Sequence, residues 1–277
     1  MEKVTVQKLL KMKEMGEKIT MVTAYDYPTA ILVDKAGLEM ILVGDSLGMV
    51  VLGYENPVPV TIDDIIHHTK PVTRGARSPF VVADMPFMSY QISLEQARSN
   101  AARLIQEGGA DAVKIEGGKE VASLVRSLAD VGIPVQAHIG LMPQRASVGG
   151  AFKVQGKTIE TANSILEDAL ALENAGAFSV VLEFVTYETA EMVTRSLKIP
   201  TIGIGSGPRC DGQVLIIHDL LGVYDDTPPF AKKYAKLNNI VTDALINFRD
   251  DVKSLRFPSG EYTIHMEKKE VEKLEKI

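Results

Sequence analysis

The chain has 277 residues, and its 30 Lys and Arg against 36 Asp and Glu give a formal net charge of −6. This length fits one large α/β domain or two smaller ones, and the ordinary apolar fraction of 45% excludes general disorder. The acidic balance argues against non-specific binding to nucleic acid or anionic membranes. The single cysteine, Cys210, excludes an intrachain disulfide and a zinc site built on cysteine pairs. The charged start is unlike a signal peptide and no apolar run could span a bilayer, so we expect a cytoplasmic protein.

Short apolar runs alternate with helical patterns along the chain. Most are continuous Val, Ile and Leu stretches, which are typical of parallel strands buried on both faces. The predicted strands are Ile19–Thr23, Met40–Gly44, Phe80–Ala83, Ala112–Ile115, Pro134–Ala137, Phe178–Leu182, Thr201–Ile204 and Val214–Ile217. Eight such units predict a single (β/α)₈ TIM barrel of the α/β class, with a doubly wound open sheet as the alternative. The barrel domain is expected over residues 1–265, followed by a charged tail over residues 266–277.

Helix start and stop signals lie between these strands. Ser93 with Gln96 predicts a capping box at the start of one helix. Thr61 with Asp64 opens another, and Pro71 is expected to kink or end it. The other predicted helices are Glu120–Val131, Thr158–Ala175 and Thr189–Leu197.

Ionisable residues gather where the predicted strands end. In a parallel barrel all carboxyl ends lie on one face, so these side chains converge on one mouth. Each residue alone could be a turn, cap or salt-bridged residue, but together they favour a functional site, because buried charges need a partner or a task. The residues are Asp45, Ser46, Asp84, Lys114, Glu116, His138 and Glu183. His218 and Asp219 are neighbours that would point to opposite sides of a strand, so they are a poor candidate for a catalytic pair.

Three of these carboxylates suit Mg²⁺ better than Zn²⁺, since they are hard oxygen ligands with no cysteine and few histidines nearby. They are Asp45, Asp84 and Glu116. A Mg²⁺ ion held there could chelate a 2-oxo acid through its carbonyl and carboxylate and thereby acidify the adjacent carbon. Glu183 is then free to remove the proton, while Lys114 neutralises the substrate's charge and His138 orients it. The pattern therefore predicts enolisation of a small oxo acid.

Two weaker motifs suggest other chemistry. Gly44-Asp45-Ser46-Leu47-Gly48 matches the GxSxG elbow of serine hydrolases, although no clear helix pattern follows it. Gly203 and Gly205 could cradle a phosphate after the seventh strand, but only Arg209 offers a basic anchor, so a tight structural turn is an equal alternative.

Several long segments resemble one known family, in the expected order and over nearly the whole chain. They are VGDSLGMVVLGY, VADMPFMSY, AVKIEGG, AHIGLMPQ, GAFKVQGK and IGIGSGPRCDGQVLIIHDLLG. The family is that of ketopantoate hydroxymethyltransferases. The resemblance implies a Mg²⁺-dependent barrel, often a homodecamer built as a dimer of pentamers. Such an enzyme transfers a one-carbon unit from methylenetetrahydrofolate to 3-methyl-2-oxobutanoate in pantothenate biosynthesis.

The resemblance also assigns residue roles. It implies that Asp45, Asp84 and Glu116 serve the metal, that Asp45, Ser46, Asp84 and Lys114 contact the oxo acid, and that Glu183 is the base. Besides the serine hydrolase, two rival interpretations stay open on the sequence alone. One is a lyase or mutase of the phosphoenolpyruvate mutase and isocitrate lyase kind, although the only cysteine follows the seventh strand. The other is a barrel that binds an oxo acid without turnover, which would leave Glu183 without a task.

Overall fold

The strands of the computed structural model, which describes residues 2–145 and 153–276, form one closed parallel barrel. The strands follow one another around it in chain order, and β1 pairs with β8, so the open-sheet alternative is excluded. The strands are β1 Ile19–Thr23, β2 Met40–Val43, β3 Phe80–Asp84, β4 Ala112–Glu116, β5 Val135–Gly140, β6 Ser179–Glu183, β7 Thr201–Ile204 and β8 Gly212–Leu215. Gly150 to Phe152, in one of the segments that carry the family resemblance, lie outside the described residues.

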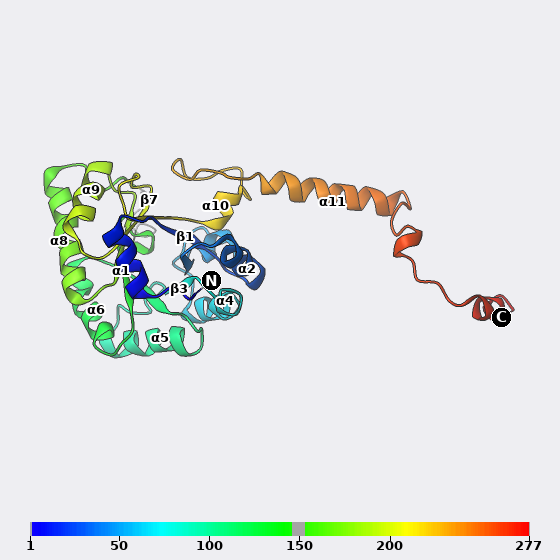
Figure 1. The fold of residues 1–277 in the computed structure, drawn as a ribbon, viewed down its shortest axis with the longest axis horizontal. Helices are drawn as coiled ribbons and strands as arrows, with labels where there is room; N and C mark the ends of the chain where they lie inside the picture. The colour runs from blue at the N-terminus through cyan, green and yellow to red at the C-terminus, as the bar shows by residue number, and fades with distance from the viewer. Residues whose placement is uncertain (1, 146–152, 277) are drawn as a thin grey trace.

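Helices surround the strands (Figure 1). The helices of the described residues are, in chain order, α1 Val6–Met15, α2 Tyr27–Ala36, α3 Leu47–Val50, α4 Ile62–Gly75, α5 Leu94–Gln106, η1 Lys119–Val121, α6 Ala122–Ala129, α8 Ile159–Ala175, α9 Tyr187–Ser196, α10 Ile217–Leu221, α11 Leu237–Lys253, η2 Gly260–Tyr262 and α12 Lys268–Leu274, and those from α11 onward lie outside the ring around the strands. Ser93 caps α5, because its hydroxyl accepts a hydrogen bond from the Gln96 amide, but the Gln96 side chain does not bond back to Ser93, so the predicted capping box forms only in part. None of the helices in the described part of the chain is long and apolar enough to cross a membrane.

The proline in α4 does not end that helix, so this part of the prediction is wrong. Pro71 lies inside α4, which continues to Gly75. The residues on both sides of the proline are held by packing: Ile65, Ile66, Val72 and Gly75 are all buried. Burial of this apolar face outweighs the one backbone hydrogen bond that proline cannot donate.

The last strand begins and ends two residues earlier than predicted. The predicted span was Val214–Ile217, whereas β8 covers Gly212–Leu215. Gly212 lies so close to β1 that a Cβ atom there would be 2.5 Å from the Ile19 carbonyl oxygen, and only glycine fits. The Ile217 amide donates a hydrogen bond to the Thr23 hydroxyl, which turns the chain into α10. His218 and Asp219 are therefore helical residues and not strand residues.

Helix α1 covers the amino ends of the barrel strands. Alternate side chains of the strands fill the interior, among them Met21, Met40 and Val82. Leu9 and Met12 of α1 join the same cluster, so the helix that precedes β1 covers the amino ends of the strands. The carboxyl ends remain as the place for a site, as is usual in this architecture.

The segment after α10 departs from the barrel. In Figure 1, α11 and the residues beyond it extend away from the other helices. No residue of α11 or α12 is buried, and α12 lies in the tail that the charge pattern predicts. The predicted domain boundary at residue 265 stays a prediction.

Candidate active site

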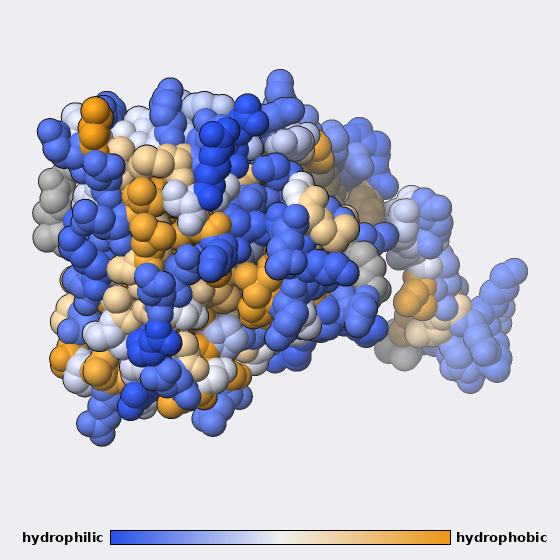
Figure 2. Space-filling model, turned by 60° about the vertical axis from the view of Figure 1, so that its left-hand side comes forward, coloured by the Kyte–Doolittle hydropathy of each residue, from blue (hydrophilic) through white to orange (hydrophobic). Residues whose placement is uncertain are grey.

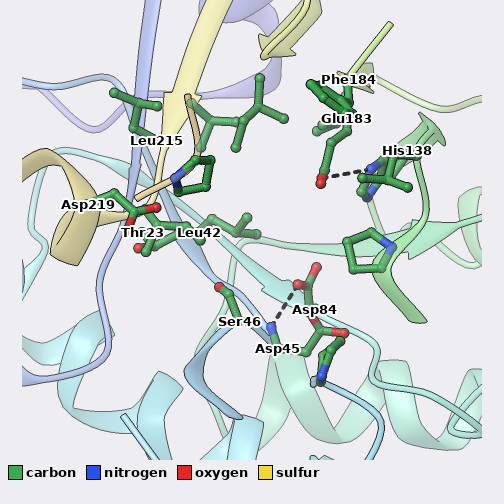
Figure 3. Close-up of a pocket in the computed structure, with 18 of the residues that line it drawn as sticks. Thr23, Leu42, Asp45, Ser46, Asp84, His138, Glu183, Phe184, Leu215 and Asp219 are labelled. Atoms are coloured by element: carbon green, nitrogen blue, oxygen red, sulfur yellow. Dashed lines mark hydrogen bonds and ion pairs between the residues drawn. The ribbon is translucent and has the colours of Figure 1, made fainter. Parts of the chain in front are cut away.

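A cavity of about 480 Å³ lies at the carboxyl ends of the strands (Figure 3). All residues predicted for the site line it: Asp45, Ser46, Asp84, Lys114, Glu116, His138 and Glu183. They converge because strand alternation carries them inward. On β3, for example, the side chains of Phe80, Val82 and Asp84 all point to the inside of the barrel. Phe80 and Val82 lie in its core, and Asp84 lies at its open end, where it lines the cavity.

A buried ion pair between Asp84 and Lys114 lines this cavity. Asp84 and Lys114 are partners in the register of β3 and β4, and their Oδ1 and Nζ atoms are 2.9 Å apart. The second oxygen of Asp84 accepts a hydrogen bond of 2.9 Å from the Asp45 amide. Burial by itself would lower the pKa of Lys114. The negative charges of Asp84 and Glu116 have the larger, opposite effect, so the lysine pKa lies above its usual range. The ion pair with Asp84 thus favours the charged form of Lys114.

Carboxylates outnumber cations around this pair. Burial, and then the nearby Asp84 charge, raise the pKa of Asp45 to about 7. Burial also raises the pKa of Glu116 well above its usual value, although Lys114 opposes this shift. Neighbouring buried carboxylates that resist losing their protons are stabilised by a further cation.

His138 connects Lys114 to Glu183. Its Nδ1 atom lies 3.2 Å from Lys114 Nζ and its Nε2 atom lies 3.3 Å from Glu183 Oε2 (Figure 3). A charged lysine can only donate, so Nδ1 accepts and the imidazole proton is on Nε2, facing Glu183. Burial and Lys114 lower the pKa of His138, which agrees with a neutral ring. The neutral ring thus lies against Glu183 without adding a charge, although the contact does not have the geometry of a hydrogen bond.

A glycine allows β5, which carries His138, and β6, which carries Glu183, to lie close together. Gly140 at the end of β5 has φ +95°, and a Cβ atom there would be 2.4 Å from the Glu183 carbonyl oxygen. Any other residue would push β5 away from β6.

Gln144 and Tyr90 complete the site, and the sequence analysis did not single them out. Gln144 is buried, and its side-chain amide donates hydrogen bonds to Asp45 Oδ2 at 2.9 Å and to the Met85 carbonyl at 3.0 Å. Its backbone amide lies 3.2 Å from Glu116 Oε2. The Tyr90 hydroxyl lies 3.0 Å from both Gln144 Oε1 and the Glu116 carbonyl oxygen. The only signal was their place inside the segments VADMPFMSY and AHIGLMPQ.

The geometry does not support the serine hydrolase interpretation. A short helix, α3, does follow Ser46. The Ser46 hydroxyl, however, lies 2.8 Å from the Tyr25 hydroxyl, and no histidine of the described residues hydrogen-bonds it. Nucleophile activation requires such a base.

The glycines after β7 have a packing role. A Cβ atom on Gly205 would be 2.8 Å from the Phe230 ring, and the Arg209 guanidinium donates to the Tyr187 hydroxyl at 2.9 Å. These contacts favour the structural turn over the phosphate cradle.

The donor set fits Mg²⁺. Among residues 2–145 and 153–276, no group of three or more His, Cys, Asp or Glu side chains is placed so that it could hold a metal ion without further ligands. Mg²⁺ is commonly held by one or two carboxylates and completes its shell with water and substrate oxygens. Asp45 and Asp84 are adjacent and buried, and Asp84 is ion-paired with Lys114. When both carboxylates are ionised, this one cation leaves one negative charge uncompensated, which suits that mode of binding. Asp45, Asp84 and Glu116 all stay predictions as metal ligands, and both oxygens of Asp84 and of Glu116 face protein groups.

The fold and the site define the class: an α/β-barrel enzyme with an acid-rich cavity at the carboxyl ends of its strands. Residues 3–260 match the family model of ketopantoate hydroxymethyltransferase. The chain is 55% identical to the 3-methyl-2-oxobutanoate hydroxymethyltransferase of Heliobacterium modesticaldum, covering 96% of this chain and 97% of that protein. It is also 55% identical to the enzyme of that name from Moorella thermoacetica, covering 94% and 97%. The chain belongs to the ketopantoate hydroxymethyltransferase family, a family of transferases, which confirms the resemblance.

The barrel itself is shared more widely. A solved structure of phosphoenolpyruvate phosphomutase from Streptomyces platensis subsp. rosaceus is similar with a TM-score of 0.61 at 15% identity, covering 94% of this chain and 92% of that one. This likeness shows the fold alone.

Proposed function

We propose that this enzyme transfers a hydroxymethyl group from methylenetetrahydrofolate to 3-methyl-2-oxobutanoate, giving ketopantoate for pantothenate and coenzyme A biosynthesis. The observation that carries the proposal is the meeting of Asp45, Asp84, Lys114 and Glu183 in one cavity of a chain that belongs to this family. Apolar side chains of Leu42, Val181 and Ile204 line the same cavity and suit the branched carbon chain of the oxo acid. We further propose a cytoplasmic location.

Each residue has a distinct task in this proposal. Asp45 and Asp84 would hold Mg²⁺, with Glu116 beside them. When bound, the metal supplies Lewis acidity that favours loss of the proton next to the substrate's carbonyl. Glu183 takes that proton, and His138 lies against its carboxylate. Lys114 neutralises the carboxylate of the oxo acid, and Ser46, held by Tyr25, hydrogen-bonds the substrate.

The chemistry of the product limits the second half of the reaction. The attacked carbon carries two methyl groups and one hydrogen, so it becomes quaternary when the new bond forms. The folate amine therefore cannot leave by a second enolisation at that carbon. Water must displace it, or formaldehyde must form before the attack.

The proposal predicts a metal-dependent product. Proton NMR of 3-methyl-2-oxobutanoate in heavy water with enzyme, Mg²⁺ and methylenetetrahydrofolate should show ketopantoate, and EDTA should abolish it. Metal-dependent loss of the methine proton without product would retain the enolising site and reject the folate donor. If folded protein gives neither change, the binding barrel without turnover becomes the better interpretation.

We propose that the protein is a homo-oligomer, expected to be a decamer, and that α11 joins its copies. Val241, Leu245, Phe248 and Val252 are spaced by four, three and four residues, so they form one apolar stripe that is exposed in the monomer. Figure 2 shows hydrophobic side chains among hydrophilic ones on the extended arm.

An apolar stripe of this kind is expected to pack against a second copy, because exposure to water is unfavourable. Light scattering should give a mass near ten copies for the wild type and a smaller one for Leu245→Lys. A monomeric wild type would contradict the proposal. Asn239→Lys, an exposed change near the start of α11 but off the stripe, is the matched control.

A further inference from the structure

Asp219 lies in the wall of the active-site cavity and has no task in the reaction described above. Only 7% of its surface is exposed, and it is the third residue of α10. Within the described part of the chain, no group donates a hydrogen bond to its carboxylate. The nearest stabilising cation is Lys233, whose ammonium instead donates to the carbonyls of Tyr224 at 3.0 Å and Asp225 at 2.6 Å. A buried carboxylate without a donor costs free energy unless a ligand provides one.

The surroundings of Asp219 are apolar. Leu215, Ile216 and Pro228 line the same cavity. Phe230 also lines it, and its ring packs against that of Phe184 with centroids 5.6 Å apart. Figure 3 shows Asp219 on the opposite side of the cavity from Glu183. This part of the cavity therefore suits a flat, largely apolar ring that carries N–H donors on one edge.

The size of the cavity leaves room for such a ring. Pockets of about 300–1,000 Å³ bind drug-sized ligands, and this one, at about 480 Å³, exceeds the needs of a five-carbon oxo acid. The proposed one-carbon donor carries an aminopyrimidinone ring with two adjacent N–H donors, which match the two oxygens of a carboxylate. We propose that Asp219 binds this edge of the folate and sets the enzyme's preference for its donor. The inference rests on the proposed function.

A purely structural role is the competing explanation. An acidic residue in the first turn of a helix can interact favourably with the free backbone amides there. The Asp219 carboxylate accepts no hydrogen bond from the start of α10, and this helix has only five residues. A structural role would show as a lower unfolding temperature with no selectivity between the two substrates.

The test is Asp219→Asn, which keeps the shape but presents an NH₂ group to the ring's donors. The KM for methylenetetrahydrofolate should rise about 10- to 100-fold, since charge-assisted hydrogen bonds are lost. The KM for 3-methyl-2-oxobutanoate and the donor-free exchange of its methine proton should change by less than about twofold, because neither involves the folate ring. Asp226→Asn removes the same charge from an exposed position nearby and is the matched control.

Different outcomes test the proposed function and the proposed contact of Asp219 with folate. If the wild type does not exchange the methine proton, the proposed function fails and the inference fails with it. If exchange occurs but Asp219→Asn leaves the folate KM unchanged, the inference alone is overturned. A rise of both KM values together with a lower unfolding temperature also overturns it. A tetrahydrofolate analogue without the 2-amino group keeps only one of the two donors, so the difference in its binding between wild type and variant should shrink, and an undiminished difference would contradict the proposed contact.

Discussion

Replacing Glu183 with glutamine is expected to slow exchange of the methine proton of 3-methyl-2-oxobutanoate by at least about 100-fold. Glutamine has nearly the same shape but cannot accept the proton. Glu183 ends β6 and faces the cavity, where His138 Nε2 lies 3.3 Å from its Oε2 atom. The measurement is the disappearance of the methine signal in heavy water with Mg²⁺ and no folate donor.

The same variant should still bind Mg²⁺. Binding to the native state alone raises the unfolding temperature in proportion to RT ln(1 + [Mg²⁺]/Kd), so wild type and Glu183→Gln should show equal Mg²⁺-dependent shifts. Glu188→Gln, an exposed change five residues further along, is the control for the loss of one charge. Equal loss of metal binding and exchange would refute the assignment of Glu183 as the base.

Replacing Asp84 with asparagine should raise the Mg²⁺ concentration needed for half-maximal activity by about 100-fold or more. An amide is a weaker ligand than a carboxylate for a hard cation, and the change also removes the charge that faces Lys114 at 2.9 Å. The Mg²⁺-dependent rise in unfolding temperature should shrink in parallel.

The stability of the metal-free protein must be measured beside this, because Asp84 also accepts the Asp45 amide. Asparagine can keep that hydrogen bond through its carbonyl oxygen, but its NH₂ group then faces the Lys114 ammonium, which is also a donor, so a lower unfolding temperature is expected for the metal-free variant. Asp130→Asn, exposed at the end of α6, is the control. Unchanged metal dependence in Asp84→Asn would remove this residue from the metal's ligands.

Much of the site was predictable because it follows from local rules. A strand repeats every two residues, so Lys114 and Glu116 had to share a side, and Asp84 had to follow the side of Val82. Parallel strands then place all carboxyl ends on one face, which brings residues far apart in the sequence to one cavity. These predictions needed no knowledge of loops or of side-chain packing.

The boundaries that failed depend on contacts between distant segments. Pro71 predicts the end of α4 because proline lacks a backbone N–H group. Burial of Val72 and Gly75 nevertheless stabilises the helix beyond it. The register of β8 is set by the close approach of Gly212 to Ile19, nearly two hundred residues earlier in the chain. Neither effect is visible in a local window of sequence.

The sequence by itself determined where the strands lie along the chain and which charges face inward, because these depend on alternation and on the common direction of parallel strands. Closure of the sheet into a barrel was decided by the pairing of β1 with β8 in the structure. Only the tertiary structure decided which groups surround those charges. Gln144 reaches Asp45 and Asp219 faces the cavity from loops and short helices, whose paths follow no repeating pattern. The neutral tautomer of His138 likewise required the position of Lys114 in space, since a proton's location depends on the group it faces.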